Sequence, residues 1–345
     1  MAKDDKKTLA AELKQVRAAM YAELDKALGK GAGRALADQE WEPLPRVSTG
    51  TLGGDYATGG IPMGRITEFY GIEGGGKTSL AVSTLAQIQK VHGPVAYIDA
   101  EHGGYEIEWA RRLGLDTDAT YTHLPETGEE AFKTAWIYLK HGVKGVVIDS
   151  VSALVTQATL KGEVGDAHVG QQARLMSQEL NRIKHLVAES GAALIFINQL
   201  REKVGQQGYG PTTTTSGGRA LRFYASTRVD VGRMHQIKDG DRQIGYQMKV
   251  KVVKNRGGPQ YRTALIPLIA DLGFDPAWEV CELGRAGGFI STSGAWYSYG
   301  EQRIGQGRLA AIEWLRQHPD VIAELRPKIA EFLETGEVFS SGSDE

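Results

Sequence analysis

The segment at residues 71–78, GIEGGGKT, matches the full G-x-x-x-x-G-K-[ST] pattern of a phosphate-binding loop. It directly follows an apolar strand candidate, 65–70, and precedes a segment, 79–91, whose apolar residues recur at helical spacing. Glycines let successive backbone N–H groups face phosphates, while Lys77 reaches the β- and γ-phosphates and the Thr78 hydroxyl holds Mg²⁺. The alternative is an ordinary glycine-rich turn, which needs neither the strand nor the helix. The residues expected to line this nucleoside triphosphate site are Gly71, Ile72, Glu73, Gly74, Gly75, Gly76, Lys77, Thr78 and Ser79.

Composition limits the class of protein. With 345 residues, 41% of them apolar and 24% charged, the chain is long enough for one large α/β domain and small appendages. Its one cysteine, Cys281, excludes an internal disulfide and a cysteine-based metal cluster. Apolar stretches are too short for a membrane span and no signal sequence is recognisable, so we expect a cytoplasmic protein without a membrane partner. Because the net charge is −2, any nucleic-acid site must be a local basic groove.

Residues 1–34 form the first predicted unit, a helix and a linker. Apolar residues recur every three or four positions from Leu9 to Leu28, which predicts one stripe of an amphipathic helix. Gly29 and two further glycines then interrupt the pattern. A tethered stripe of this kind packs either on the core of its own chain or on a neighbouring subunit, and the residues permit both.

Residues 35–272 form the second predicted unit, in which strand candidates alternate with helical segments. This alternation predicts an α/β fold with a mostly parallel central sheet and helices on both faces. Residues 273–335, with helical segments at 307–317 and 320–333, predict a small C-terminal α/β domain, and 336–345 a short disordered acidic tail. The predicted strands are 66–70, 95–100, 121–123, 145–149 and 192–198, followed by more closely spaced antiparallel additions at 227–233, 247–254 and 261–269.

Three of the predicted strands end in a polar residue. These residues are Glu101, Asp149 and Gln199. The carboxyl edge of a parallel sheet is where ligands bind in this architecture, so we expect the three side chains near the phosphates. Asp149 would hold Mg²⁺ with Thr78, Glu101 would position the attacking water, and the Gln199 amide would bond the γ-phosphate. The alternatives are a helix-capping aspartate, a surface glutamate and an unremarkable strand-end glutamine.

Two segments without apolar periodicity follow the same sheet edge. The longer one, about 200–218, is rich in glycine and threonine, and a loop of that length inside a compact domain is usually functional. The other, about 161–172, precedes a helical segment that carries Arg174. Basic residues and Tyr209 give the longer loop the means to follow phosphates and stack on bases. Each basic residue alone is more simply a solvated surface charge.

These residues resemble the bacterial RecA family of recombinases along nearly the whole chain. The stretches IDAEH, FINQ and KVVKN, in that order, carry most of the resemblance. VVIDSVSAL, GEVGDAHVGQQARLMSQ, TTTTSGGRALRFYASTRVD and GAWYSYGEQRIGQGR add to it. The resemblance implies a RecA-type P-loop ATPase core with an N-terminal docking helix and a small C-terminal domain.

The resemblance also implies roles for individual residues. Lys77 and Thr78 would bind ATP and Mg²⁺ with Asp149, Glu101 would activate water, and Gln199 would sense the γ-phosphate.

Lys254 and Arg256 match positions that reach the ATP of a neighbouring subunit, so hydrolysis would require a filament. The first 28 residues would then be similar to the family's docking helix on the adjacent subunit.

The two loops resemble the family's DNA-binding loops, with some departures. Val169 stands where the family commonly has Met, the longer loop lacks the usual Met-Phe-Gly, and Trp109 replaces the Tyr that stacks on adenine. Two C-terminal arginines stand at basic positions that resemble the family's gateway for duplex DNA. The expected DNA-binding residues are Val169, Arg174, Ser177, Arg201, Lys203, Tyr209, Gly217, Gly218, Arg219, Arg303 and Arg308.

We therefore expect a DNA-dependent ATPase that forms helical filaments of its own copies on single-stranded DNA and exchanges strands with a homologous duplex. A LexA-like repressor is a further partner that the resemblance raises. The rivals are a ring-shaped hexameric helicase-like motor, a phosphoryl-transferring kinase, and a nucleotide-gated partner-binding module without efficient strand exchange.

Overall fold

The structure is a computed structural model, and it describes residues 2–33, 43–104, 106–162, 170–202 and 213–335. The chain divides into two compact units, Met1–Pro43 and Leu44–Glu345. The predicted acidic tail lies outside the described residues. No helix in the described ranges is long and apolar enough to cross a membrane.

The smaller unit consists mainly of α1 (Ala2–Leu28), which confirms the predicted amphipathic helix. The Asp25 carboxylate accepts the N–H of Gly31 at 2.9 Å just beyond the helix end. The apolar stripe is open to solvent, since Leu13 and Val16 are 60% and 65% exposed. A stripe exposed to this degree gains its burial energy only by packing against a further surface.

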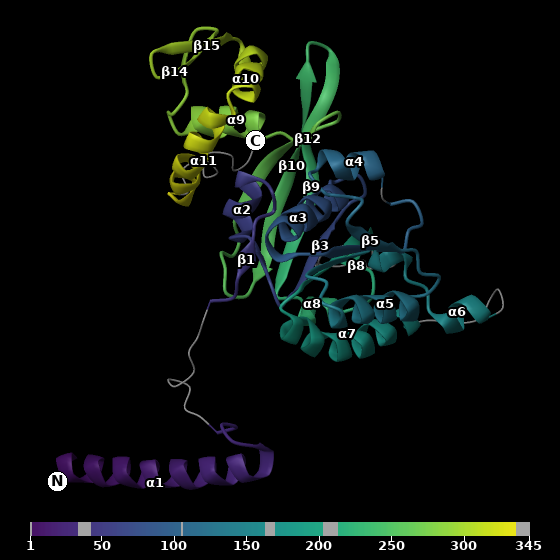
Figure 1. Ribbon diagram of the computed structural model, residues 1–345, viewed down its shortest axis with the longest axis vertical. Helices are drawn as coiled ribbons and strands as arrows, with labels where there is room; N and C mark the ends of the chain where they lie inside the picture. The colour runs from purple at the N-terminus through teal and green to yellow at the C-terminus, as the bar shows by residue number, and fades with distance from the viewer. Residues whose placement is uncertain (1, 34–42, 105, 163–169, 203–212, 336–345) are drawn as a thin grey trace. The chain divides into compact units, whose positions relative to one another are not determined.

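The larger unit is built on one sheet (Figure 1). All neighbours from β9 to β5 are parallel, while β9, β10, β11 and β12 pair antiparallel. Every predicted strand is present. β9 pairs antiparallel with β10, as predicted, and it also pairs parallel with β3, which was not predicted from the sequence. In order across the sheet the strands are β12 (Gly273–Phe274), β11 (Thr263–Ile269), β10 (Arg242–Asn255), β9 (Thr227–Asp239), β3 (Ile66–Gly71), β7 (Ala193–Glu202), β6 (Gly145–Asp149), β4 (Val95–Asp99) and β5 (Thr120–His123).

Helices cover both faces of this sheet, as predicted (Figure 1). Strand side chains alternate between the two cores: Tyr97 packs with the helices of one face, and Ala96 and Ile98 pack with those of the other. One face carries α2 (Leu52–Thr58), α3 (Lys77–His92) and α4 (Ile107–Arg112), and the other carries α5 (Gly128–Lys140), α7 (Gln171–Ser190) and α8 (Ala220–Tyr224). Short elements complete this part: β1 (Arg46–Val47), β2 (Ile61–Pro62), η2 (Val151–Ala153), α6 (Gln157–Lys161) and β8 (Thr213–Thr215).

The C-terminal part combines three helices with a small antiparallel sheet (Figure 1). Its core also contains Leu52, Ile237 and Ile269 from the preceding α/β part. The buried Glu279 carboxylate accepts the N–H groups of Leu52 and Gly53 at 2.8 and 2.7 Å, which ties the two parts together. The elements are α9 (Pro276–Ala286), β13 (Ser291–Ser293), β14 (Trp296–Tyr299), β15 (Gln302–Gln306), α10 (Arg308–Gln317) and α11 (Pro319–Glu334).

Loss of the Glu279 carboxylate should lower the free energy of unfolding. Glu279→Leu leaves two buried N–H groups without their acceptor, and each unpaired group costs about 1–3 kcal/mol. Urea unfolding should show this loss, while Glu331→Gln, at an exposed position of α11, should stay within about 0.5 kcal/mol of the parent. An unchanged free energy of unfolding for Glu279→Leu would contradict the assigned contact.

Candidate nucleotide site

The loop at residues 71–78 joins the end of β3 to the start of α3. It lies against β9 and β10, which leaves no room for a Cβ atom at three of its glycines, Gly71, Gly75 and Gly76. A Cβ atom on Gly71 would lie 1.9 Å from the carbonyl oxygen of Val231, and one on Gly76 would lie 2.6 Å from Met248 Sδ. Gly76 also has a φ of 93°, a left-handed conformation that glycine adopts readily. The sequence pattern therefore corresponds to a loop held tightly by the sheet behind it.

Lys77 and Thr78 begin α3, and the Lys77 side chain turns back toward the loop. Lys77 Nζ donates to the carbonyl oxygen of Ile72 at 2.7 Å, and burial lowers the pKa of this lysine while Asp149 opposes the shift. An ammonium group that donates to a carbonyl of its own loop is positioned to donate instead to a phosphate bound in that loop.

Asp149 ends β6 beside Thr78. One of its carboxylate oxygens accepts the Thr78 hydroxyl at 2.8 Å and the Tyr97 hydroxyl at 2.6 Å. Burial raises the pKa of Asp149 to about 6, and a cation at this carboxylate would favour the ionised form. A hydroxyl and a carboxylate are oxygen ligands of the kind Mg²⁺ prefers, so the residues fit the ion when phosphates supply further ligands. Among the described residues no group of three or more His, Cys, Asp or Glu side chains could hold a metal alone.

Glu101 and Gln199 meet at the same edge. Gln199 Nε2 donates to Glu101 Oε1 at 3.0 Å, and the Ser150 hydroxyl donates to the same oxygen. Asp99 Oδ1 accepts the Glu101 N–H at 3.1 Å and so orients the loop that carries Glu101. The three strand ends predicted to converge do converge. Sequence reasoning missed Ser150 and Asp99, although each adjoins one of the motifs.

Trp109 lies beside the start of α3. Its indole N–H donates to the Ser79 hydroxyl at 3.0 Å. Trp109 also lines a hollow of about 320 Å³ together with Thr78, Val82 and Gly103. The hollow therefore adjoins the phosphate loop on the side of α4, with an aromatic ring in its wall.

Lys254 and Arg256 lie at the opposite edge of the sheet. β10 touches the phosphate loop through Met248, and Lys254 is six residues further along the strand, about 20 Å from Met248 at strand spacing. Lys254 Nζ donates to the carbonyl oxygens of Arg222 and Phe223 at 2.7 and 3.2 Å. Burial, then Arg256, lowers the pKa of Lys254. The structure thus does not bring these two cations to the phosphate loop of their own chain.

Phe223 is a residue that sequence reasoning missed. Its side chain is 70% exposed, and it lines a hollow of about 420 Å³ with Arg256. The sequence could have pointed to it only as an aromatic residue within a segment that is typical of a short helix. This edge therefore carries an exposed aromatic ring close to Lys254 and Arg256.

The two predicted DNA loops need corrections at their ends. β7 continues through Arg201 to Glu202 and pairs antiparallel with β8. Residues 200–202 and 213–215 of the loop predicted at 200–218 are therefore paired strands. The loop predicted at 161–172 ends earlier, because Gly170 caps α7, which begins at Gln171. β-branched threonines favour the extended pairing that the absence of apolar periodicity concealed. Val169, Lys203 and Tyr209 lie outside the described residues.

The ends of the two loops lie against each other. Gly217 and Gly218 have φ values of 77° and 75°, and a Cβ atom on Gly218 would lie 2.9 Å from the Cβ of Ala173 in α7. Arg174 and Ser177 lie on α7, and Arg219 precedes α8. The return of the longer loop is therefore packed on the helix that follows the shorter one.

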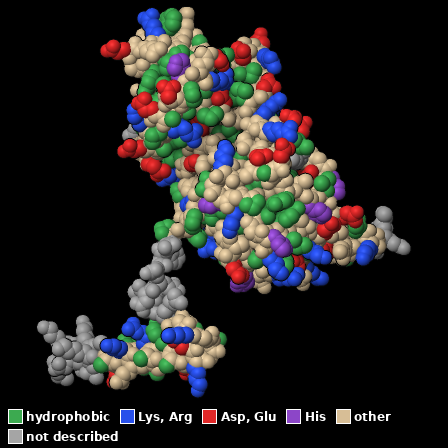
Figure 2. All heavy atoms as spheres, in the orientation of Figure 1, with side chains coloured by type: hydrophobic (Ala, Val, Ile, Leu, Met, Phe, Trp, Pro, Cys, Tyr) green, Lys and Arg blue, Asp and Glu red, His purple; other side chains and the backbone are tan. Residues whose placement is uncertain are grey.

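The C-terminal candidates Arg303 and Arg308 stand on β15 and at the start of α10. The Arg303 guanidinium lies 5.0 Å from the Trp296 ring centre, and that of Arg308 lies 5.1 Å from the ring of Trp278. Acidic and basic side chains are interspersed over the face of the larger unit shown in Figure 2. This mixture agrees with a net charge near zero and with basic sites that are local.

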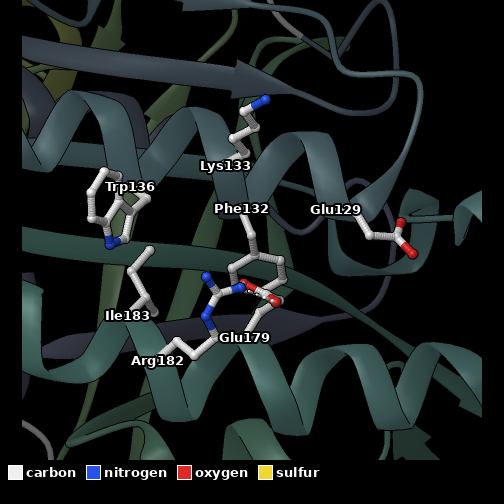
Figure 3. Close-up of a pocket in the computed structure, with 7 residues that line it drawn as sticks. All are labelled: Glu129, Phe132, Lys133, Trp136, Glu179, Arg182 and Ile183. Atoms are coloured by element: carbon white, nitrogen blue, oxygen red, sulfur yellow. Dashed lines mark hydrogen bonds and ion pairs between the residues drawn. The ribbon is translucent and has the colours of Figure 1, made fainter.

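A separate hollow of about 410 Å³ lies between α5 and α7 (Figure 3). Phe132, Trp136 and Ile183 form its apolar lining, and Glu179 pairs with Arg182 at 2.9 Å. None of the phosphate-loop residues lines it. It is therefore distinct from the nucleotide site.

The glycines of the loop should differ in how well they tolerate alanine. Gly71→Ala should abolish nucleotide binding and lower the melting temperature, because the added methyl cannot fit against the Val231 carbonyl. Gly74→Ala meets nothing within 4 Å and should cost only the left-handed backbone conformation, about 1–2 kcal/mol. Binding of a fluorescent ATP analogue and thermal unfolding measure both effects. Equal behaviour of the two variants would argue against this loop conformation.

Comparison with known proteins assigns the family. The RecA N-terminal domain model matches residues 14–275, and the RecA C-terminal domain model matches residues 279–334. Protein RecA of Thermus aquaticus is 45% identical over 312 residues, 89% of this chain and 91% of that protein. Protein RecA of Nautilia profundicola is 43% identical, with 90% and 89% of the two chains covered. The chain belongs to the RecA family of recombinases, which are DNA-dependent ATPases.

Proposed function

We propose that copies of this chain assemble head to tail into filaments on single-stranded DNA, hydrolyse ATP with Mg²⁺ between neighbours, and exchange strands with duplex DNA. One observation carries the proposal. Lys77, Asp149 and Glu101 gather at one edge of the sheet, whereas Lys254 and Arg256 gather at the other. Each chain thus holds both halves of a site, facing in opposite directions.

At the phosphate loop we assign roles by chemistry. Lys77 binds the β- and γ-phosphates, and Thr78 and Asp149 hold Mg²⁺, which neutralises the charge that develops during transfer. Glu101 orients and polarises the attacking water, and its position is set by the hydrogen bonds from Ser150 and Gln199. The wall formed by Trp109 offers a ring on which adenine stacks.

At the opposite edge we assign contacts with the next copy. Lys254 and Arg256 act as fingers toward the neighbour's ATP, and Phe223 packs into that contact. Fingers in phosphoryl-transfer enzymes contribute about 10³–10⁵ in rate. The exposed stripe of α1 docks on a neighbouring subunit, which covers Leu13 and Val16.

DNA would bind along the two loops, close to the γ-phosphate sensor. Gln199 lies two residues before Arg201 on β7, and Gly217 and Gly218 close the same loop. A γ-phosphate that draws the Gln199 amide away from Glu101 would favour a second arrangement of the loop. The remaining proposed DNA contacts are Val169, Arg174, Ser177, Lys203, Tyr209 and Arg219 for single strands and Arg303 and Arg308 for duplex.

We place this activity in the cytoplasm, and we retain a LexA-like repressor as a proposed partner of the filament. A hexameric helicase-like motor or a partner-binding module is not favoured, because the RecA family match extends through the C-terminal domain.

Subunit mixing tests the shared site. Lys77→Ala and Lys254→Ala should each abolish hydrolysis alone, yet a mixture should recover turnover. In a random equal mixture about a quarter of head-to-tail contacts pair an intact phosphate loop with an intact Lys254. ATP turnover on single-stranded DNA is the measurement. A mixture as inactive as its components would exclude the finger role of Lys254.

DNA binding should depend steeply on salt, because phosphate contacts release counterions. Fluorescence anisotropy of a labelled oligonucleotide with a non-hydrolysable ATP analogue should give a log–log slope that becomes less negative by about 0.7 for each phosphate contact removed. Arg219→Gln is the variant to compare with the parent, and Arg182→Gln, on the exposed surface of α7, is its control. A slope near zero for the parent would refute the phosphate-tracking role.

A further inference from the structure

A buried polar cluster lies in the middle of the sheet, formed by Glu68 of β3, Asn198 of β7 and Arg228 of β9. Glu68 and Asn198 are fully buried, and Arg228 is 8% exposed. Glu68 and Arg228 are direct cross-strand neighbours. None of the roles proposed above uses these three side chains.

Glu68 joins the other two members. One of its carboxylate oxygens accepts Asn198 Nδ2 at 2.9 Å, and the other accepts Arg228 Nε. The Arg228 guanidinium also stacks 4.6 Å from the Tyr70 ring centre. The three strands are therefore joined by side chains as well as by their backbone ladders.

Asn198 extends the cluster to both ends of the longer DNA loop. Its Oδ1 accepts the backbone N–H of Gln199 at 2.9 Å, and its Nδ2 donates to the carbonyl oxygen of Ser216 at 3.1 Å. Gln199 leads into this loop and Ser216 leads out of it. The cluster thus touches the γ-phosphate sensor and the return of the loop at the same time.

Arg228 extends the cluster to the other edge. It is the register partner of Lys254 across the antiparallel pair of β9 and β10. Arg228 contributes to lowering the pKa of Lys254 and Glu68 opposes it, so both charges are close enough to act on that ammonium. A continuous set of contacts therefore leads from Gln199 to Lys254.

Stability alone does not account for this cluster. A buried ion pair repays its desolvation poorly, and apolar side chains of similar volume in its place are often neutral or stabilising. The hydrogen bonds of the cluster instead hold two strand ends and a loop carbonyl in position. This geometry favours a role in linking the structure of one edge of the sheet to that of the other.

We propose that Glu68 is a positioning residue that, through Asn198 and Arg228, couples the γ-phosphate sensor and DNA loop of one chain to the finger that chain offers its neighbour. The inference rests on the proposed function. Loss of the cluster should leave nucleotide binding intact but uncouple hydrolysis from DNA and from neighbouring sites.

The test replaces Glu68→Met together with Arg228→Met, which removes both charges without leaving either unpaired. Asp275→Asn with Arg316→Met is the control, because it removes a different ion pair, of 2.6 Å, which is partly buried, and Asn still caps α9. For each chain we would measure thermal unfolding, affinity for a fluorescent ATP analogue, the ratio of kcat with and without single-stranded DNA, and the Hill coefficient for ATP.

We expect the double-Met chain to keep its melting temperature and its affinity for the ATP analogue. The stimulation of its kcat by DNA should fall about 10²-fold, as for a misplaced catalytic group. Its Hill coefficient should fall to that of independent sites, and the control should match the parent. Parent-like stimulation and Hill coefficient in the double-Met chain would overturn the inference alone. A parent without DNA stimulation would overturn the proposed function as well.

Arg228→Lys is a second test if the double-Met chain does not fold, because this variant keeps the charge and loses the Nε donor. An intermediate loss of DNA stimulation at unchanged analogue affinity supports the coupling, and parent-like stimulation overturns it.

Discussion

The change of chain direction between β9 and β10 determines where the charged groups of the site lie. β9 runs parallel to β3 and so supports the phosphate loop at the carboxyl edge of the sheet. β10 runs back, touches that loop with Met248 and carries Lys254 to the other edge. A rigid sheet then keeps the two sets of charged groups apart, so a single chain cannot bring them together. A head-to-tail contact between copies brings them together, and such a contact generates a ring or a helix according to its rotation.

Polar side chains at strand ends bring the reacting groups together at the carboxyl edge. β3, β7, β6 and β4 are parallel neighbours, so residues that follow them on the chain lie side by side in space. The hydrogen bond between Gln199 and Glu101 places the proposed sensor on the proposed water-orienting carboxylate. Because β7 continues into the hairpin with β8, a shift at Gln199 has a short covalent route to the DNA loop.

Much of this arrangement was predictable because it depends on local patterns. Apolar runs predicted the strands, and the polar residue after each run predicted the convergence of Glu101, Asp149 and Gln199. The parallel pairing of β9 was missed because close spacing along the chain does not reveal which strand is the neighbour. The Glu68–Arg228 pair was missed for the same reason: the two residues are far apart in the chain, and strand register alone brings them together. Phe223 stayed unnoticed because exposure is a property of the folded surface.

If a second copy completes the active site, ATP turnover per chain must depend on assembly. We would measure this turnover across a dilution series, with and without single-stranded DNA, and image the same samples for filaments. Turnover per chain should fall toward zero on dilution without DNA, and DNA should restore it together with filaments. Equal turnover by dilute single chains with and without DNA would show that one copy suffices.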